Sequence, residues 1–577
     1  MLFQTTLKIL AGLLLLSLSF RLAGQETVIR LAATSDVHGS LFPYDFEENR
    51  SDKSSLAGVA HLVDSIRKIR NDNLVLLENG DLVQGTPVSY YANFVQKKRT
   101  NLFARILNCM DYDAATVGNH DIEAGPAVYN HLKEAFRFPY LGGNVRNTHT
   151  GSSYFQPYTV IERSGIRIAV IGLLTTGVPQ WLPPHLWEGL KFQDMAETAG
   201  KLVSTVREKE NPDVVVGLFH SGYGDDRGTA GDVPMEDAGR YIAQNVPGFD
   251  VIFLGHDHRV RNEILTNRQG EEVLVLNPGS NAQNLAYAEL SVRDEKGGKP
   301  GITSRKGLLI PVSGVVSGKK FNRKFWKDEA EILKFSNQEI GRIGVPMQAA
   351  DALFGTSALA GLIHRVQLES TGADISFTAP LSVTGSYLPG PLYVRDLFKM
   401  YRYENFLYTM RLSGSEIQRY LEYSCGLWFN RMDGPEDHLL LFRNGETPKA
   451  GLQNPPYHFD SAAGIRYVVD VTKPAGKRVQ ITGMENGKPF DPAGIYKVAV
   501  NSYRGSGGGG HLTTGAGIDP GELPLRIISS SEVDFRTLLM KHIQAEKIIN
   551  PDPGNNWEII PADYHKKGKQ KDMIYFY

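Results

Sequence analysis

Residues 28–39 read VIRLAATSDVHG, an apolar run that ends in two metal-binding side chains, Asp36 and His38. Four more segments follow apolar runs in the same way: Gly80-Asp81, Gly118-Asn119-His120-Asp121, His220-Ser221-Gly222 and Gly255-His256-Asp257-His258. Near-continuous apolar runs are typical of parallel strands buried on both faces. In open α/β sheets, ligands bind at the carboxyl ends of the strands. The sequence therefore predicts one rim that holds Asp36, His38, Asp81, Asn119, His220, His256 and His258.

The predicted rim offers carboxylate, amide and imidazole groups but no thiolate. Such ligands suit two borderline or hard divalent metals, and they allow Zn, Mn, Fe or Co without choosing among them. A pair of metals held in this way stabilises both the attacking and the leaving oxygen when a phosphate ester is hydrolysed. The rim therefore predicts a dimetal phosphoesterase.

The overall composition excludes a general attraction to polyanions. The chain has 577 residues with 62 basic and 63 acidic side chains, a net charge of −1. At roughly 150 residues each, this length suggests about two to four domains. A balanced charge creates no field that would steer the protein to nucleic acid or to an anionic membrane. We expect a small-molecule substrate, and the sequence implies no protein partner.

The first 24 residues resemble a secretory signal peptide. Lys8 precedes the apolar run 9–16, and the small residues Ala23 and Gly24 follow it. This pattern predicts cleavage near Gly24 and a periplasmic or secreted protein without a stable membrane anchor. The alternative is an uncleaved anchor, but the run is short for a span of about 20 residues.

The two cysteines, Cys109 and Cys425, lie in different predicted domains. Free buried thiols are therefore favoured over a disulfide.

The pattern along the chain predicts two α/β domains. Residues 25–320 alternate strand and helix patterns, which is typical of a layered α/β domain. Residues 321–345 contain a charged amphipathic helix, interpreted as a linker between domains; the alternative is that it belongs to the surface of one domain. Residues 346–550 form a second α/β domain. Residues 551–577 are polar and Lys-rich, and they are predicted to be a surface tail.

The ordered motifs resemble a known family. The order D-x-H, G-D, G-N-H-[DE], H and G-H-x-H is similar to that of the calcineurin-like metallophosphoesterases. Residues 501–511, NSYRGSGGGGH, resemble the glycine-rich nucleotide-site segment of the 5′-nucleotidase C-terminal domain. The resemblance covers residues 28–515.

The resemblance implies a role for each rim residue. Asp36, His38 and His258 would hold the first metal, and Asn119, His220 and His256 the second. Asp81 would bridge both. His120 would stabilise charge or protonate the leaving oxygen, and Asp121 would orient it.

Several segments are more similar to 2′,3′-cyclic-nucleotide 2′-phosphodiesterase/3′-nucleotidases than to 5′-nucleotidase/UDP-sugar hydrolases. Residues 79–87, NGDLVQGTP, resemble the motif N-G-D-x-x-Q-G-[ST]-P. Residues 457–460 resemble Y-N-F-D, with His458 in place of the usual Asn. Two arginines that 5′-nucleotidases carry have no evident counterpart near 378–386. The first activity is therefore favoured, and the 5′-nucleotidase reading stays open.

A nucleotide also needs an aromatic slot for its base, where stacking contributes roughly 1–3 kcal/mol. Tyr457, Phe459 and Tyr503 are the candidates, because each lies in a loop beside glycine or proline. Arg504 is a candidate partner for phosphate or the base edge, and Asn405 matches a family position close to the substrate.

Two rival hypotheses remain for the function of the protein. One is a dimetal phosphatase for a non-nucleotide ester; the other is a secreted non-catalytic binding protein, which would lack metal ligands that are all present here.

Overall fold

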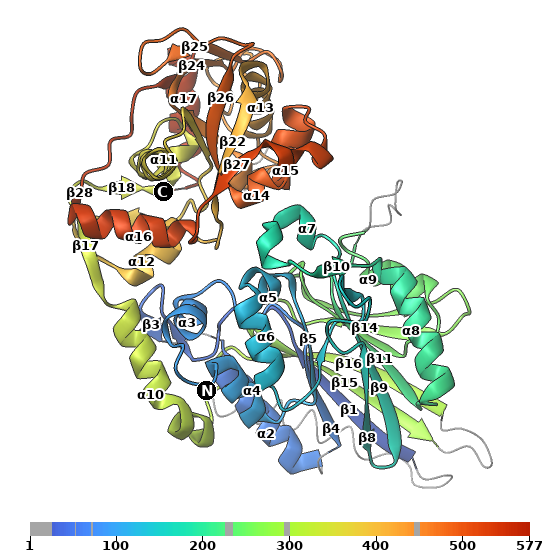
Figure 1. Ribbon diagram of the computed structural model, residues 1–577. Coiled ribbons are helices and arrows are strands. Elements are labelled where there is room, and N and C mark those ends of the chain that lie inside the picture. The colour runs from blue at the N-terminus through green and yellow to red at the C-terminus, as the bar shows by residue number, and fades with distance from the viewer. Residues whose placement is uncertain are drawn as a thin grey trace.

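The structure is a computed structural model that describes residues 26–51, 54–70, 73–224, 235–293, 301–443 and 451–576. Two α/β domains follow one another along the chain, as predicted (Figure 1). The predicted signal peptide lies outside these residues. Within them, we find no helix with the length and apolar character needed to span a bilayer. Both cysteines are free, as expected.

The first domain is built on two six-stranded sheets. The first sheet has the order β16-β15-β1-β4-β5-β6, and the second has the order β13-β14-β12-β11-β9-β8. The first sheet is antiparallel at one edge, where β16, β15 and β1 pair, and the second is antiparallel at both edges; all other strand pairs are parallel. The first sheet contains β1 (Glu26–Thr34), β4 (Leu74–Glu78), β5 (Ala114–Thr116), β6 (Tyr140–Leu141), β15 (Asn284–Arg293) and β16 (Gly301–Pro311). The second contains β8 (Tyr158–Arg163), β9 (Ile166–Leu174), β11 (Val214–His220), β12 (Val251–Leu254), β13 (Arg261–Thr266) and β14 (Glu272–Asn277).

The two sheets pack face to face, because their strands are apolar on both sides. Leu31 and Leu77 from the first sheet meet Val216 and Phe253 from the second in one buried core. Helices cover the two outer faces, which gives four layers (Figure 1). The first sheet is covered by α2 (Leu56–Arg70), α4 (Leu102–Met110), α6 (Pro126–Ala135) and α10 (Lys319–Ser336), and the second by α8 (Met195–Lys209) and α9 (Gly239–Asn245).

Helix α10 is the helix that was interpreted as a linker. It buries Phe321, Phe325 and Ile332 in the core of the first domain. Its Asp328 accepts two hydrogen bonds from Arg105, at 2.7 and 2.9 Å. The helix therefore packs on the first domain over most of its length, while Phe335 in its last turn packs against the core of the second domain, and its role as a linker stays a prediction. The chain enters the second domain at β17 (Glu339–Ile343).

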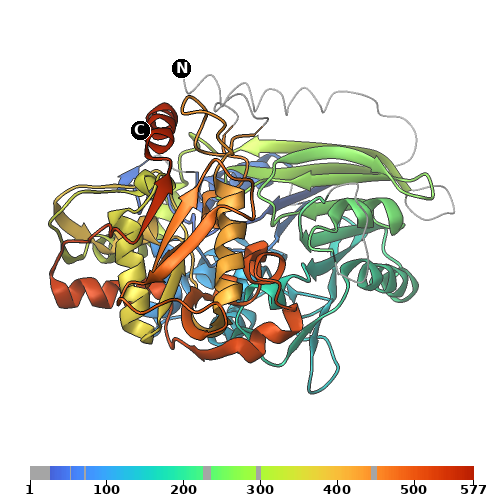
Figure 2. The same ribbon diagram turned by 90° about the horizontal axis from the view of Figure 1, so that it is seen from above.

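The second domain has a central sheet with the order β23-β19-β26-β22-β27. Helices flank this sheet on both sides, as the view from above shows (Figure 2). The strands are β19 (Ile375–Thr378), β22 (Leu407–Ser413), β23 (Ser461–Ala463), β26 (Ile495–Asn501) and β27 (Ile527–Ser530). The main helices are α11 (Ala358–Thr371), α12 (Val394–Met400), α13 (Gly414–Trp428) and α16 (Phe535–Glu546).

Residues 551–576, the described part of the predicted surface tail, form regular structure. They contain β29 (Trp557–Ile560), which pairs in parallel with β24 (Ile465–Asp470), and α17 (Ala562–Met573). The side chains of Trp557 and Ile559 point into the core of the second domain. Two inward residues are enough for a strand of this length, and a strand so short between polar residues gives no clear sequence pattern.

Candidate metal centre

The five predicted segments do end strands, but the strands belong to both sheets. Asp36 and His38 follow β1, Asp81 follows β4, and Asn119 opens the short helix α5 (Asn119–Glu123) after β5. From the second sheet, His220 ends β11, and His256 and His258 follow β12. The sandwich brings these strand ends to one edge. The structure therefore places all seven predicted rim residues in two adjoining groups.

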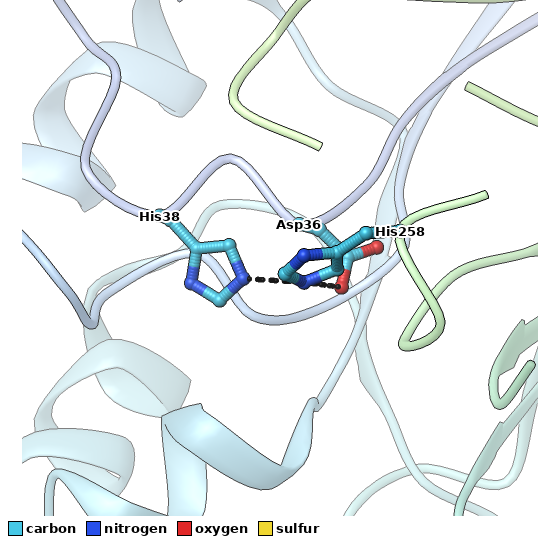
Figure 3. A group of neighbouring side chains, drawn as sticks. All are labelled: Asp36, His38 and His258. Atoms are coloured by element: carbon cyan, nitrogen blue, oxygen red, sulfur yellow. Dashed lines mark hydrogen bonds and ion pairs between the residues drawn. The ribbon is translucent and has the colours of Figure 1, made fainter. Parts of the chain in front are cut away.

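The first group consists of Asp36, His38 and His258, whose side chains point toward one another (Figure 3). Their potential ligand atoms all lie within 4.8 Å of one another. The Nε2 atom of His258 is 3.0 Å from Nε2 of His38 and 3.4 Å from Oδ1 of Asp36. Burial lowers the pKa of His38 to about 4, which favours the neutral imidazole that a metal requires.

The second group consists of Asp81, His220 and His256, again within 4.8 Å, with Asn119 beside them. Nε2 of His220 lies 3.1 Å from Oδ2 of Asp81 and 3.1 Å from Oδ1 of Asn119. Nδ1 of His256 lies 2.9 Å from the same amide oxygen. The other nitrogen of His220, Nδ1, donates to the carbonyl of Asn79 at 2.7 Å. A histidine held through one nitrogen in this way presents the other to a metal.

The donor set fits divalent metals. Burial opposes ionisation of Asp81, but the charges of His220 and His120 outweigh it and hold the pKa of this carboxyl well below its usual range. The lowered pKa favours the ionised carboxylate that a metal requires. Oxygen and imidazole donors at these spacings match the preference of Zn, Mn, Fe or Co.

The backbone of the rim is strained. Five of the seven residues have a positive φ: Asp36 (50°), His38 (47°), Asp81 (56°), His256 (69°) and His258 (57°). Residues other than glycine rarely adopt such angles. Strain of this kind persists where the surrounding structure enforces it, and it clusters at functional sites.

His120 lies next to the rim, and its acidic partner differs from the predicted one. Nδ1 of His120 contacts Oε2 of Glu123, one turn further along α5. Burial alone would lower the pKa of His120, but the charges of Asp81 and Glu123 raise it to about 9. The prediction that Asp121 orients His120 was therefore wrong. The i, i+3 spacing on a helix was the available signal for Glu123.

Asp121 instead holds the loop that carries Asp81. Its carboxylate accepts hydrogen bonds from the backbone amides of Gly118 (2.8 Å), Leu82 (3.0 Å) and Asp81 (3.1 Å). It is 1% exposed. Its role is to fix the backbone between two strand ends.

A cleft of about 290 Å³ lies between the domains, next to His120. It contains three of the predicted substrate residues, Asn405, Tyr457 and Tyr503. The sequence did not point to Tyr403, whose ring meets that of Tyr457 edge-on with centroids 6.4 Å apart. The full lining is Asn119, His120, Glu123, Trp181, Leu182, Glu236 and His256 from the first domain, and Leu381, Tyr403, Asn405, Tyr457, Asn501 and Tyr503 from the second.

Trp181 is another residue that the sequence analysis missed. It ends the short helix α7 (Val178–Trp181), and its ring stacks on His256 with centroids 5.4 Å apart. A single tryptophan beside two prolines gives no periodic pattern, so only the tertiary structure places it at the cleft.

Two predicted substrate residues are not in the cleft. Phe459 is fully buried, and its ring stacks on Trp428 in the core of the second domain. Arg504 is 3% exposed, and its guanidinium donates to both oxygens of Asp460, at 2.8 and 3.1 Å. The predictions for Phe459 and Arg504 were therefore wrong. A sequence motif in a loop identifies candidate residues, but it does not show which of their side chains face the solvent.

The four glycines at 507–510 make a sharp bend. Gly507, Gly509 and Gly510 have φ values of 101°, 72° and 74°. A Cβ atom on Gly508 would lie 2.4 Å from the ring of Tyr503. The glycines therefore let the backbone pass close behind an aromatic side chain of the cleft.

Two family models match the chain. The model for calcineurin-like phosphoesterase matches residues 29–260, and that for the 5′-nucleotidase C-terminal domain matches residues 339–515. These matches confirm the resemblance that the motifs indicate.

Curated relatives and solved structures agree with these domains. The chain is 26% identical to the trifunctional nucleotide phosphoesterase protein YfkN of Bacillus subtilis over 94% of its own length, and it spans 39% of that protein. It is 27% identical to the 2′,3′-cyclic-nucleotide 2′-phosphodiesterase/3′-nucleotidase of Haemophilus influenzae, with 93% of this chain and 88% of the relative covered. The crystal structure of the 5′-nucleotidase precursor from Thermus thermophilus matches with a TM-score of 0.63 at 22% identity, covering 93% of this chain and 100% of that one. This last match establishes the fold.

Proposed function

Because the chain belongs to the calcineurin-like phosphoesterases that carry a 5′-nucleotidase C-terminal domain, we propose that it hydrolyses phosphate esters of nucleotides with two divalent metal ions. One observation carries this proposal. The cleft between the domains has the predicted metal ligands Asn119 and His256 on one side and Tyr457 and Tyr503 on the other. A phosphate and a base could occupy such a cleft together.

The residue assignments follow from the two groups. Asp36, His38 and His258 would hold one ion, and Asn119, His220 and His256 the other. Asp81 would bridge them, since it lies in the second group and its charge acts on Asp36 and His38 of the first. Two ions bound there would lower the pKa of a water and withdraw charge from the phosphoryl oxygens.

Residues of the chain would transfer the proton to the leaving group and bind the base. Asp81 and Glu123 raise the pKa of His120 to about 9, which favours a protonated imidazole near neutral pH. It lines the cleft and would donate a proton from Nε2 to the leaving oxygen, while Glu123 holds Nδ1. Tyr457 and Tyr503 would stack on the base.

We expect Glu123→Gln to lower kcat by roughly 10–10²-fold, a part of what general acid catalysis contributes. The variant keeps the size of the side chain but removes the carboxylate that orients and charges His120. Steady-state kinetics at saturating substrate would measure the effect. Asp64→Asn, on the surface helix α2, is the control. A kcat equal to that of the unchanged protein would show that Glu123 has no part in the reaction.

Tyr457→Ala and Tyr503→Ala should each raise KM for a nucleotide roughly tenfold, because each removes a stacking surface. Hydrolysis of bis(p-nitrophenyl) phosphate, which has no base, should stay within about twofold. Equal losses with both substrates would indicate a damaged fold, and no loss with the nucleotide would favour the rival phosphatase for a non-nucleotide ester.

The position of the ester on the ribose is the finer part of the proposal. The motifs at 79–87 and 457–460, and the likeness to the Haemophilus influenzae relative, favour 2′,3′-cyclic-nucleotide 2′-phosphodiesterase and 3′-nucleotidase activity. Comparison of kcat/KM for 2′,3′-cyclic AMP, 3′-AMP, 5′-AMP and UDP-glucose tests this directly. A strong preference for 5′-AMP or UDP-glucose would establish the alternative activity instead.

The cellular location belongs to the proposal as well. The signal pattern of residues 1–24 supports a periplasmic or secreted enzyme that recovers phosphate and nucleosides outside the cytoplasm.

A further inference from the structure

One wall of the cleft is an irregular segment, residues 401–405, that lies between α12 and β22. It carries Tyr403 and Asn405 into the cleft. Because the segment forms no helix or strand, its backbone lacks a regular hydrogen-bond ladder. Its position must therefore be set by other contacts.

Arg536, in the first turn of α16, makes several of these contacts. Nε donates to the carbonyl of Tyr401 at 3.2 Å, and Nη2 donates to the carbonyl of Arg402 at 2.9 Å. The guanidinium carbon lies 4.0 Å from the ring centre of Phe398, and the side chain is 2% exposed. The neighbouring amide of Phe535 donates to the carbonyl of Asn405 at 2.7 Å. The start of α16 thus holds the segment at both of its ends.

The third nitrogen of Arg536 faces Glu404. Nη1 lies 3.5 Å from Oε1 of Glu404, and both atoms are buried without a hydrogen-bond partner among the described residues. A small movement of the segment would close this gap. Glu404 is also within electrostatic reach of Glu123 and His120 across the domain boundary. The arginine is therefore linked, through one short segment, to the side of the cleft where the proposed proton donor lies.

We infer that Arg536 is a positioning residue for nucleotide binding: it touches no substrate, but it fixes the segment that presents Tyr403 and Asn405 to the nucleoside. This inference rests on the proposed function. It assigns a role to an arginine that lies in the other domain from the metal ligands and outside every motif at the rim. Lysine cannot replace it, because a single ammonium group does not reproduce the fork geometry that contacts two carbonyls and a carboxylate.

The test uses Arg536→Lys in the full-length, metal-loaded protein. We expect KM for a nucleotide to rise roughly tenfold, the effect of losing charged hydrogen bonds that order the segment. We expect kcat for the nucleotide, and kcat/KM for bis(p-nitrophenyl) phosphate, to change by less than about twofold. An unchanged KM for the nucleotide would overturn the inference.

The chain offers a matched control in Arg478. It is also buried in the second domain, and it also donates to backbone carbonyls, those of Phe429 (2.6 Å), Lys473 (2.9 Å) and Cys425 (3.3 Å). None of these residues lines the cleft. Arg478→Lys should lower Tm without raising KM. If both variants raise KM equally, the effect is one of stability and the inference fails.

A second variant and a binding measurement complete the test. If Arg536→Lys does not fold, Glu404→Gln weakens the same contact from the other side, and it should raise KM for the nucleotide about two- to threefold. The Kd for adenosine, measured by calorimetry, should weaken in parallel with KM. If the unchanged protein hydrolyses the model diester but binds no nucleoside, the proposed function fails. If it binds nucleosides and the variants bind them equally well, only the present inference fails.

Discussion

Asp81→Asn is expected to lower kcat by roughly 10³-fold or more, equivalent to about 4 kcal/mol of transition-state stabilisation. Asp81 is buried in the second group, where its carboxylate lies 3.1 Å from Nε2 of His220 and accepts a hydrogen bond from the backbone amide of His120 at 2.8 Å. An amide of the same size cannot offset two positive ions. We therefore expect the variant to lose at least one metal ion per chain, which metal analysis after gel filtration would measure.

Asp250→Asn is the matched control for this prediction. Asp250 directly precedes β12, at the end of the strand opposite the rim, and it accepts a hydrogen bond from the amide of Val215 at 2.9 Å. Its replacement should lower Tm but leave the metal content unchanged. Full metal content and full activity in Asp81→Asn would contradict the assignment of Asp81 as the bridging ligand.

His120→Asn is expected to lower kcat by about 10²–10⁴-fold, the usual contribution of a general acid. Its metal content should stay the same, because His120 is paired with Glu123 and belongs to neither ligand group. This combination of results separates a proton donor from a ligand. Substrates with a good leaving group, such as p-nitrophenyl esters, should lose much less, because they do not need a proton.

His131→Asn, on the surface of α6, provides the control for a general effect of removing a histidine. If His120→Asn lost metal, His120 would have to be counted among the ligands. If nucleotides and p-nitrophenyl esters lost activity equally, His120 would act on the phosphoryl group and not on the leaving oxygen.

The position of the rim could be predicted from the sequence, because the candidate ligands directly follow strand ends. An apolar run that stops at a polar ligand type marks both a strand and its carboxyl end, so Asp36, Asp81 and His220 could be assigned without any tertiary information. The division of these strands between two sheets could not be predicted. Buried strands of one sheet and of two packed sheets have the same apolar pattern.

The substrate side was harder to predict, because its residues lie in loops. Tyr457 and Tyr503 face the cleft, but Phe459, two positions from Tyr457, is fully buried. Which of two aromatic residues in a loop faces outward depends on the packing beneath it, here on Trp428. Arg504 was misassigned for the same reason: its partner Asp460 was visible in the sequence, but the burial of the pair was not.

The pairing of two sheets at the rim has a mechanical consequence. Each ligand group draws members from both sheets: β1 and β12 supply the first group, while β4, β11 and β12 supply the second. An ion bound in either group would therefore link the two sheets of the sandwich to each other. Binding of the metal ions would then also stabilise the fold of the first domain, and a chain without its ions would be less stable.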